Sequence, residues 1–595
     1  MPRQPQPTGS MYPMPLPRWG FIFSVMAIAL AVAVRLQQPV GAEPVTYCYK
    51  SVRTHDKERA SATCFSVQGG VFSRVWSHDE RTPAKFGESS SETVINGHVM
   101  PGLWDGHGHL MAYGEFLHSV DLFGAKSLSE AKARIKAYIK KNPGVGTKDR
   151  WIRGVGWDQD VYGRMPTAAD IEQDPDLKGT YMMLDRIDVH CIWVSQSVLD
   201  LLPPDIRDIP GGEIIREPGM GVFCDNAMDY VVKLWPKPDA KSKAATVKPA
   251  ISKLNQVGLV GMHDASSLPD DISIYRDMAN SDDWTLRVYG MYECRQRNTF
   301  CPSETTQIER DDSRFTVKSV KLFADGALGS WGSAMISPYA DHSWTSGSLL
   351  VNASALTTLT KSWAAAGYQV NIHAIGDLAN RNAIDAFVEA LKQQCPQATT
   401  DADLAACQRA HRFRIEHAQI IHPDDQARMH SLGIIPSIQP THATSDMKYA
   451  LDRLGPERTD NEAYRMRSVL DIHPILGSDF PVEPPNPFHG IYAAVSRKNP
   501  DTGLGVNGSH QGWHTDEALS LDQALWGFTG ATAYGAFLEG RAGLIKEGAF
   551  ADWLVLDEPI EALDIEKLRT LQVRETWVAG KKRGSLLSNR IQLFI

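Results

Sequence analysis

Several features that would assign a chain to a specialised class are missing from this sequence. Its 61 basic residues are outnumbered by 70 acidic ones, and the net charge of −9 provides no basic surface for nucleic acid. No segment repeats with a fixed period, which argues against a solenoid, and no two cysteines form a Cys-x-x-Cys pair, which argues against a structural zinc knuckle. With 43% hydrophobic and only 22% charged residues, the composition predicts a large globular protein of more than one domain.

The apolar run near the N-terminus is short for a membrane span. After a proline-rich start, Arg18 precedes an uncharged run from Trp19 to Val34, whereas a transmembrane helix needs about 20 residues. Val40-Gly41-Ala42 offers the small residues that signal peptidase prefers. We therefore expect residues 1–42 to be a cleaved signal peptide, with an uncleaved type II signal anchor as the alternative. Either way, the folded part is secreted, or membrane-anchored with its folded domain lumenal or extracellular.

Cysteine usage agrees with a secretory route. The count of eight is even, as expected where disulfides form, and the spacing makes local pairs such as Cys294 with Cys301 and Cys395 with Cys407 the easiest to imagine. The sequence leaves the full connectivity open. Asn352 and Asn507 begin Asn-x-Ser triplets, which predict a glycoprotein if the chain is secreted.

The two ends of the chain have the pattern of short β-strands. Residues 60–67, 71–76 and 92–99 alternate with polar turns, and residues 551–556 and 573–578 have the same character. We expect residues 43–98 and 541–595 to form one small β-sandwich domain, which requires the ends to meet in space.

Between these ends, apolar strand-like runs alternate with helical patterns. This alternation is typical of βα units around a parallel sheet. The predicted strands are the opening run at 100–104 and residues 258–263, 286–292, 317–323, 368–373, 413–417, 434–439 and 472–477. Because eight strands close a (β/α)₈ barrel, we expect an α/β fold with a TIM-like barrel over residues 99–540. The block at about 149–248, rich in proline and glycine near its centre, is predicted to be an insertion after the first barrel strand.

The opening strand ends in two histidines, His107 and His109. On an extended backbone, side chains two positions apart project to the same face, so two imidazoles can bind one cation. Gly106 and Gly108 permit a tight turn, and taken alone this segment is equally compatible with an ordinary glycine-rich turn.

Four further positions close predicted barrel strands with a polar residue. These are Lys321, His373, His417 and Asp479. Taken singly, either histidine is compatible with a hydrogen-bonded core residue, Lys321 with a side chain reaching solvent, and Asp479 with a turn. Together they lie at successive strand ends, where a barrel brings side chains into one active site. The joint pattern therefore predicts a metal site.

The order His-x-His, Lys, His, His, Asp resembles that of the amidohydrolase superfamily. The surrounding sequence segments resemble those of its amidohydrolase 3 branch, the YtcJ-like proteins. The matching segments lie at residues 151–158, 258–265, 320–326, 414–418, 477–482 and 490–495. This resemblance covers about residues 94–580.

The resemblance implies a two-metal centre. His107 and His109 would hold one metal and His373 and His417 a second, with carbamylated Lys321 as the bridge. Asp479 would bind the first metal, accept a proton as metal-bound hydroxide attacks a carbonyl, and pass that proton to the departing amine. Two zinc ions suit these ligands best, with iron or manganese as the alternatives, and one metal is expected if Lys321 is not carbamylated.

The sequence departs from the family pattern beside the predicted pocket. Relatives carry Arg-x-Asp-Gly-His-Ser, whereas here Val189 replaces the glycine and Cys191 replaces the serine. Trp157, His190, Gln439 and His442 are candidate substrate-binding residues, as are Trp331 and Asp446; each is also compatible with a loop position outside the pocket.

These observations predict a metal-dependent hydrolase acting on carbon–nitrogen bonds other than peptide bonds, with a small-molecule amide, N-acyl or N-formyl amide as substrate. A deaminase or an esterase/lactonase on the same scaffold is the alternative within enzymes, although deaminases of this kind usually lack the bridging lysine. A catalytically silent binding protein is the alternative outside enzymes. All six presumed metal residues are present, which argues against it.

Overall fold

The computed structural model describes residues 43–77 and 93–585. The predicted signal peptide or anchor lies outside these residues, and so does the start of the strand predicted from Glu92. No helix in the described part of the chain combines the length and apolarity that crossing a bilayer requires.

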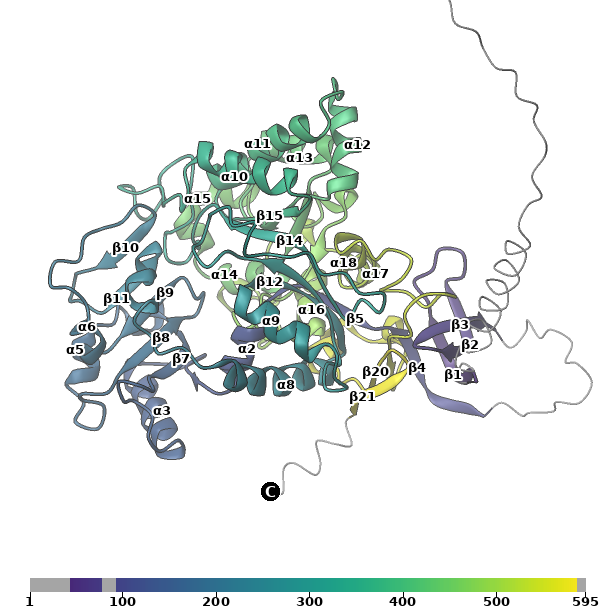
Figure 1. The fold of residues 1–595 in the computed structure, drawn as a ribbon, viewed down its shortest axis with the longest axis horizontal. Coiled ribbons are helices and arrows are strands. Elements are labelled where there is room, and N and C mark those ends of the chain that lie inside the picture. Colours follow the sequence, from purple (N-terminus) through teal and green to yellow (C-terminus); the bar gives the residue numbers. More distant parts are fainter. Residues whose placement is uncertain (1–42, 78–92, 586–595) are drawn as a thin grey trace, which may run out of the picture.

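The two chain ends form one seven-stranded sheet, as predicted (Figure 1). Its strands, in spatial order, are β21 (Lys581–Ser585), β20 (Glu575–Val578), β19 (Trp553–Leu556), β4 (Val94–Pro101), β1 (Val45–Arg53), β2 (Ser61–Gln68) and β3 (Val71–Trp76). Strand β4 joins the ends, because it pairs parallel to β1 and antiparallel to β19. Aromatic side chains from both ends pack together, with Phe65 against Trp553 at 5.1 Å between ring centroids.

Eight parallel strands form the barrel. In spatial order they are β18 (Ile475–Leu476), β17 (Ile435–Ile438), β16 (Arg414–His417), β15 (Gln369–Ala374), β14 (Phe315–Phe323), β13 (Arg287–Tyr292), β12 (Leu259–Ser267) and β5 (Leu103–Gly108). A parallel bridge between Gly108 and Phe480 connects β5 to the segment after β18. The predicted barrel is therefore confirmed, with its first strand beside its last.

The opening apolar run serves two sheets instead of one. The structure divides it at Gly102, where β4 of the chain-end sheet stops and β5 of the barrel starts. A side chain at this position is impossible without rearrangement, because a Cβ on Gly102 would lie 2.4 Å from the Val260 side chain. Apolarity continues across the division because both strands are buried, so the sequence pattern shows no break.

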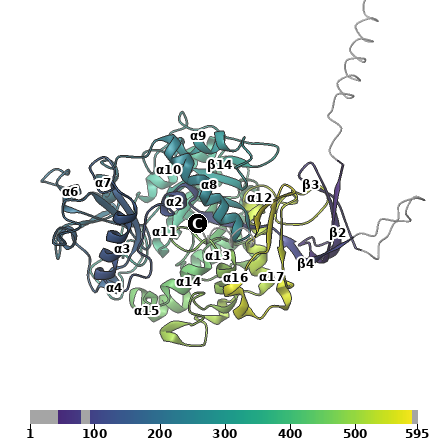
Figure 2. The same cartoon turned by 90° about the horizontal axis from the view of Figure 1, so that it is seen from below.

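Helices surround the barrel, and one of them, α8 (Ala240–Gln256), also contacts β20 and β21 of the chain-end sheet (Figures 1 and 2). The helices are α2 (Leu110–Phe116), α8 (Ala240–Gln256), α9 (Pro269–Met278), α10 (Ala353–Ala365), α11 (Asp377–Gln394), α12 (Asp401–His411), α13 (Pro423–Leu432), α14 (Pro440–Asp446), α15 (Ala450–Asn461), α16 (Pro487–Ser496), α17 (Leu521–Gly527) and α18 (Gly530–Gly535). The buried apolar residues of most of these helices share one hydrophobic core with the barrel strands, whereas those of α14 and α15 belong to a smaller cluster.

The insertion is a separate layer with its own sheet and core. Its strands, in spatial order, are β10 (Gly212–Ile215), β11 (Val222–Asp225), β9 (Cys191–Val194), β8 (Met182–Arg186), β7 (Ile152–Trp157) and β6 (Val120–Asp121). Its helices are α3 (Leu128–Lys141), α4 (Gln159–Tyr162), α5 (Ala168–Glu172), α6 (Gln196–Leu199) and α7 (Asp229–Val232). The sheet begins at Val120, earlier than the predicted boundary at 149. Its first strand, β6, pairs with β7, and α3 lies between these two strands in the sequence. Figures 1 and 2 show this layer on the side of the barrel opposite the chain-end sheet.

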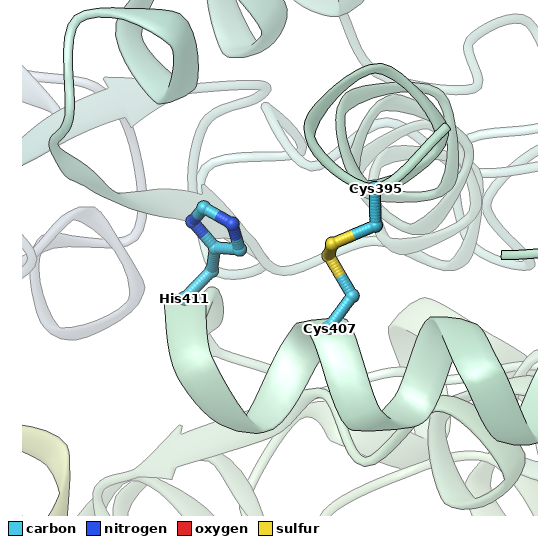
Figure 3. A group of neighbouring side chains, drawn as sticks. All are labelled: Cys395, Cys407 and His411. Carbon is cyan, nitrogen blue, oxygen red and sulfur yellow. A yellow bond between two sulfur atoms is a disulfide. The ribbon is translucent and has the colours of Figure 1, made fainter. Parts of the chain in front are cut away.

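All eight cysteines are paired. The local disulfides Cys294–Cys301 and Cys395–Cys407 occur as predicted, and the other two, Cys48–Cys64 and Cys191–Cys224, each join paired strands. Figure 3 shows His411 beside the Cys395–Cys407 bond; these sulfurs are bonded to each other and so are not free to bind a metal. Four disulfides are typical of a protein that folds in an oxidising environment.

Candidate metal centre

The six predicted ligands come from five places around the barrel. His107 lies on β5 and His109 just after it, Lys321 lies on β14, and His373 and His417 lie at or near the ends of β15 and β16. Asp479 follows β18 and has φ of +62°. All except His109 are buried. The parallel order of the strands places these side chains at one end of the barrel, as expected for this fold.

The ligand atoms converge around Asp479. Its Oδ1 lies 3.0 Å from Nε2 of His109 and 3.5 Å from Nε2 of His107, and its Oδ2 lies 4.0 Å from Nδ1 of His417. Lys321 Nζ lies 3.5 Å from Nε2 of His107. The ring centroids of His373 and His417 are 4.5 Å apart. The structure thus brings all six predicted residues together.

This donor set fits a divalent cation. Within the described residues, His373 Nε2 and Asp479 Oδ1 are buried without a hydrogen-bond partner, which is costly unless another group satisfies them. Potential ligand atoms of His107, His417 and Asp479 all lie within 4.8 Å of one another. Imidazole nitrogen and carboxylate oxygen are ligands that zinc accepts.

Glu416 sets the orientation of His107. Its Oε2 lies 2.5 Å from His107 Nδ1, so this nitrogen donates its proton to Glu416 and leaves Nε2 with a free electron pair. Arg414 binds both carboxylate oxygens of Glu416, at 2.6 and 3.0 Å, and also donates to Nδ1 of His263 at 2.6 Å. Although burial raises the pKa of Glu416, the charges of Arg414 and His107 hold it well below its usual range.

Gln439 positions His417 and does not line the cavity. Its Oε1 accepts a hydrogen bond from His417 Nδ1 at 2.9 Å, which leaves Nε2 of His417 for a cation. The side chain is buried behind the histidine. The structure thus places Gln439 where it orients His417.

Burial acts differently on Lys321 and Asp479. Burial lowers the pKa of Lys321 to about 8, so its neutral amine is accessible near neutral pH. Burial alone would raise the pKa of Asp479, but His107 and His109 hold it well below its usual range. A carboxylate held ionised among histidines can accept a proton from a group that approaches it.

Two buried aspartates that the sequence analysis left without a role hold the strand ends in place. Asp105 accepts hydrogen bonds from the backbone of His107 and from Ser478, so it ties the first barrel strand to the last. Asp325 accepts from the backbone N–H groups of residues 334, 375 and 376. Burial raises the pKa of each to about 7. Asp105 lies within β5 and Asp325 two residues after β14, and a carboxylate in or next to an apolar strand is the signal that could have identified them.

A narrow cavity of about 80 Å³ opens beside the centre. His190, His373, His417, His442, Asp446 and Asp479 contribute to its wall, so three of the six candidate substrate-binding residues, His190, His442 and Asp446, line it. The remaining lining residues that carry charge or a phenol are Asp158, Arg186, Asp188, Lys448, Tyr449 and Glu483. His190 Nδ1 donates to Asp225 at 2.8 Å, and the rings of His190 and His373 lie 5.4 Å apart.

Trp157 lies elsewhere. Its indole N–H donates to the backbone oxygen of Leu184 at 2.8 Å, and its ring belongs to the core of the insertion. Trp331 lines a different cleft, between the insertion and the barrel. Neither indole contributes to the wall of the narrow cavity, because each is packed by its own layer.

The structure explains one of the two departures from the family pattern beside His190, the cysteine, whereas Val189 has no structural explanation. Val189 has φ of +56°, a conformation that favours glycine and is strained for a β-branched residue. Cys191 forms the disulfide with Cys224, which lies next to Asp225. The substituted segment therefore carries a covalent link adjacent to the His190–Asp225 pair.

Comparison with known proteins agrees with this centre. The profile of the amidohydrolase family matches residues 95–582. The putative amidohydrolase YtcJ of Bacillus subtilis (strain 168) is 26% identical, over 87% of this chain and 94% of the relative. The N-substituted formamide deformylase of Arthrobacter pascens is 25% identical, over 90% of this chain and 97% of the relative.

Among solved structures, an uncharacterized metal-dependent hydrolase from Pyrococcus horikoshii superposes with a TM-score of 0.68 at 23% identity, covering 87% of this chain and 98% of that one. A second, from Pyrococcus furiosus, gives 0.64 at 24% identity over 88% and 99%. At these identities the structural likeness concerns the fold. The family profile, which spans most of the sequence and contains the six converging residues, shows that this chain belongs to the amidohydrolase family.

Proposed function

We propose that this protein is a metal-dependent hydrolase that cleaves the carbon–nitrogen bond of a small N-acyl or N-formyl amide. The observation that carries the proposal is the convergence of the six buried or half-buried donors at the mouth of the barrel. The alternative of a silent binding protein has little support, since every residue that this chemistry requires is present.

In this proposal His107, His109 and Asp479 hold one divalent cation, and His373 and His417 hold a second. Lys321, carbamylated on Nζ, bridges them; without that modification one cation is expected. Zinc suits the donor set best. When bound, such cations polarise a carbonyl oxygen and lower the pKa of water.

The protein's own groups supply proton transfer and orientation. Asp479 accepts the proton released when water adds to the carbonyl carbon, and it returns that proton to the nitrogen of the departing amine. Glu416 and Gln439 keep the Nδ1 protons of His107 and His417 turned away from the centre. His190 and His442 lie on the cavity wall, where they contact the acyl side of the substrate.

Two observations favour a small acyl or formyl group. The cavity beside the centre is narrow, at about 80 Å³, which suits a compact group next to the ligands. One relative, which this chain matches over nearly the relative's whole length, is named an N-substituted formamide deformylase. A deaminase reaction is disfavoured, because deaminases on this scaffold usually lack the lysine that is present here as Lys321.

We also propose that the protein acts in the secretory pathway, as a secreted enzyme or as a type II membrane protein. The four disulfides support this location. The sequons at Asn352 and Asn507 are on exposed residues and are the proposed glycosylation sites.

The test is metal analysis combined with turnover. Protein purified from a secretory host should contain near-stoichiometric transition metal and hydrolyse at least one member of a panel of formamides, acetamides, lactams and esters. His107→Ala should lose metal and activity together. His430→Ala, which alters a half-exposed histidine on α13, is the matched control and should retain both. A fully active protein without metal would overturn the proposal, as would a metal-loaded protein that turns over no amide.

A further inference from the structure

A second, wider cleft lies between the insertion and the barrel. Its volume is about 920 Å³, within the range of small-molecule sites, against about 80 Å³ for the cavity at the metal centre. One wall is formed by α4 and β10 of the insertion, and the other by the loop between β14 and α10. Nothing in the hydrolytic chemistry proposed above uses this cleft.

The barrel side of the cleft carries a row of planar groups in contact, called the stack below, whose neighbouring rings are tilted by 33° and 46° to one another. The Arg453 guanidinium lies 3.8 Å from the Trp331 ring centre. Trp331 and His342 follow at 4.0 Å between centroids, and His342 and Trp344 at 4.5 Å. Asp341 fixes the inner part of the stack, since it accepts from the Trp331 indole at 3.1 Å and pairs with Arg453.

The outermost ring of this stack is open to solvent. Trp344 is 77% exposed, more than any other large hydrophobic residue in the described part of the chain. The indole at the end of the stack therefore leaves a large aromatic surface accessible to a ligand. Trp331, which His342 separates from Trp344, has φ of +59°. This value is strained for a bulky residue, and such backbone strain is concentrated at functional sites.

The insertion side of the cleft is acidic. Asp160, Glu213 and Glu217 line it, and within the described residues no cation lies at ion-pair distance from either glutamate. Arg164 is the only lysine or arginine in the lining, and both of its terminal nitrogens bind Asp170, at 2.5 and 2.8 Å. The charge that reaches the cleft is therefore negative.

We propose that this cleft binds a flat organic cation. The cation would extend the stack by lying against Trp344, where the negative face of the indole attracts positive charge, and would donate its N–H groups to Glu213 and Glu217. An anion of the same shape is excluded by the uncompensated carboxylates, and a neutral ring gains only the stacking contact.

The cleft also adjoins the metal centre. Asp225 lines the cleft, and its carboxylate accepts the hydrogen bond from His190 on the wall of the narrow cavity. The chain segments around 158–160 and 327–332 contribute to both spaces. The bound cation is therefore the charged end of the amide substrate, a role that rests on the proposed hydrolase function, whereas binding itself does not.

Isothermal titration of the metal-loaded protein with benzamidine tests the binding, with benzamide and benzoate as neutral and anionic molecules of the same shape. We expect benzamidine to bind at least tenfold more tightly than either. Trp344→Ala and the double variant Glu213→Gln/Glu217→Gln should each weaken benzamidine by about tenfold. Trp526→Ala and Asp229→Asn, at exposed positions outside the cleft, should leave the affinity unchanged. Equal affinity for the three probes, or an affinity unaffected by Trp344→Ala, would overturn the proposal.

Turnover separates this site from the catalytic proposal. For an amide with an aryl amidinium group, Trp344→Ala should raise KM about tenfold with kcat unchanged, and it should raise KM for the neutral carboxamide analogue much less, because that analogue loses only the stacking contact. An unchanged KM for the amidinium substrate would refute the subsite role. If neither of these amides nor any amide of the panel is hydrolysed, the proposed function fails, and the benzamidine titration still decides whether the cleft binds a cation.

Discussion

Glu416 determines which nitrogen of His107 can bind a cation. Because the carboxylate holds the Nδ1 proton, Nε2 keeps its electron pair and points toward Lys321 and Asp479. Arg414 in turn holds Glu416 ionised, and both side chains are buried completely. Glu416 therefore determines which nitrogen of His107 carries the proton, although Glu416 itself does not line the cavity.

We expect Glu416→Gln to weaken metal binding about 10- to 100-fold, because the amide holds the His107 proton less firmly than a carboxylate does. Competition with a chromogenic chelator measures this affinity. Glu389→Gln, on the outer surface of α11, removes the same charge without touching the centre and serves as the control. If Glu416→Gln keeps the original affinity, the orientation of His107 has another cause.

Val189 stores backbone strain beside His190. Its φ of +56° costs a non-glycine residue about 1–3 kcal/mol, whereas glycine adopts this conformation freely. We expect Val189→Gly to raise the free energy of unfolding by about 1 kcal/mol after the extra entropy of unfolded glycine is subtracted. Chemical denaturation measures the change. Val189→Ala keeps most of the strain and should gain less, so an equal gain in both variants would contradict the strain argument.

At the scale of elements, the disulfide Cys191–Cys224 joins β9 to β11 at the cavity wall. His190 and Asp225 are the adjacent residues, and they are joined by a backbone and a side-chain hydrogen bond, both of 2.8 Å. Asp225 has φ of +51° and ψ of −127°, which an unconstrained aspartate rarely adopts. The covalent link therefore helps to hold this pair in place.

We expect Cys191→Ser/Cys224→Ser to lose about 2–4 kcal/mol of stability and also to raise KM for the hydrolysed amide severalfold. Cys395→Ser/Cys407→Ser removes a disulfide between α11 and α12, remote from the cavity, and should lose stability with KM unchanged. Thermal unfolding and steady-state kinetics on both variants distinguish the two effects. An unchanged KM in the first variant would show that the link serves stability alone.

Local patterns explain why the barrel strands and the ligands could be predicted. His107, His373 and His417 each close or nearly close an apolar run, which is visible without knowledge of neighbours in space. Glu416, Asp105 and Gln439 act through partners far away in sequence or behind the ligand, so their roles required the structure. The early start of the insertion was missed for the same reason, because β6 is two residues long and is defined only by its pairing with β7.

At the scale of the whole molecule, the chain-end sheet is attached to the barrel through a buried ion pair. Arg287, on barrel strand β13, binds Asp552 of the C-terminal segment through two contacts of 2.6 and 3.0 Å. Both side chains are almost fully buried, and Asp552 also accepts the backbone N–H of Ala579. The guanidinium lies over the Phe550 ring at 3.8 Å. The sequence alone could not predict this ion pair, because Arg287 and Asp552 lie 265 positions apart.

This pair leads to a prediction about how the two domains unfold. Asp552→Ala leaves the guanidinium of Arg287 buried without its partner, so we expect a loss of about 3–5 kcal/mol and a lower melting temperature for the whole chain. In the double variant Arg287→Met/Asp552→Leu no charge is left unpaired, and the expected loss is about 1–2 kcal/mol, mainly because Ala579 N–H loses its acceptor. Chemical denaturation followed by tryptophan fluorescence measures both. If the double variant is as unstable as Asp552→Ala, packing at this junction matters more than the buried charge.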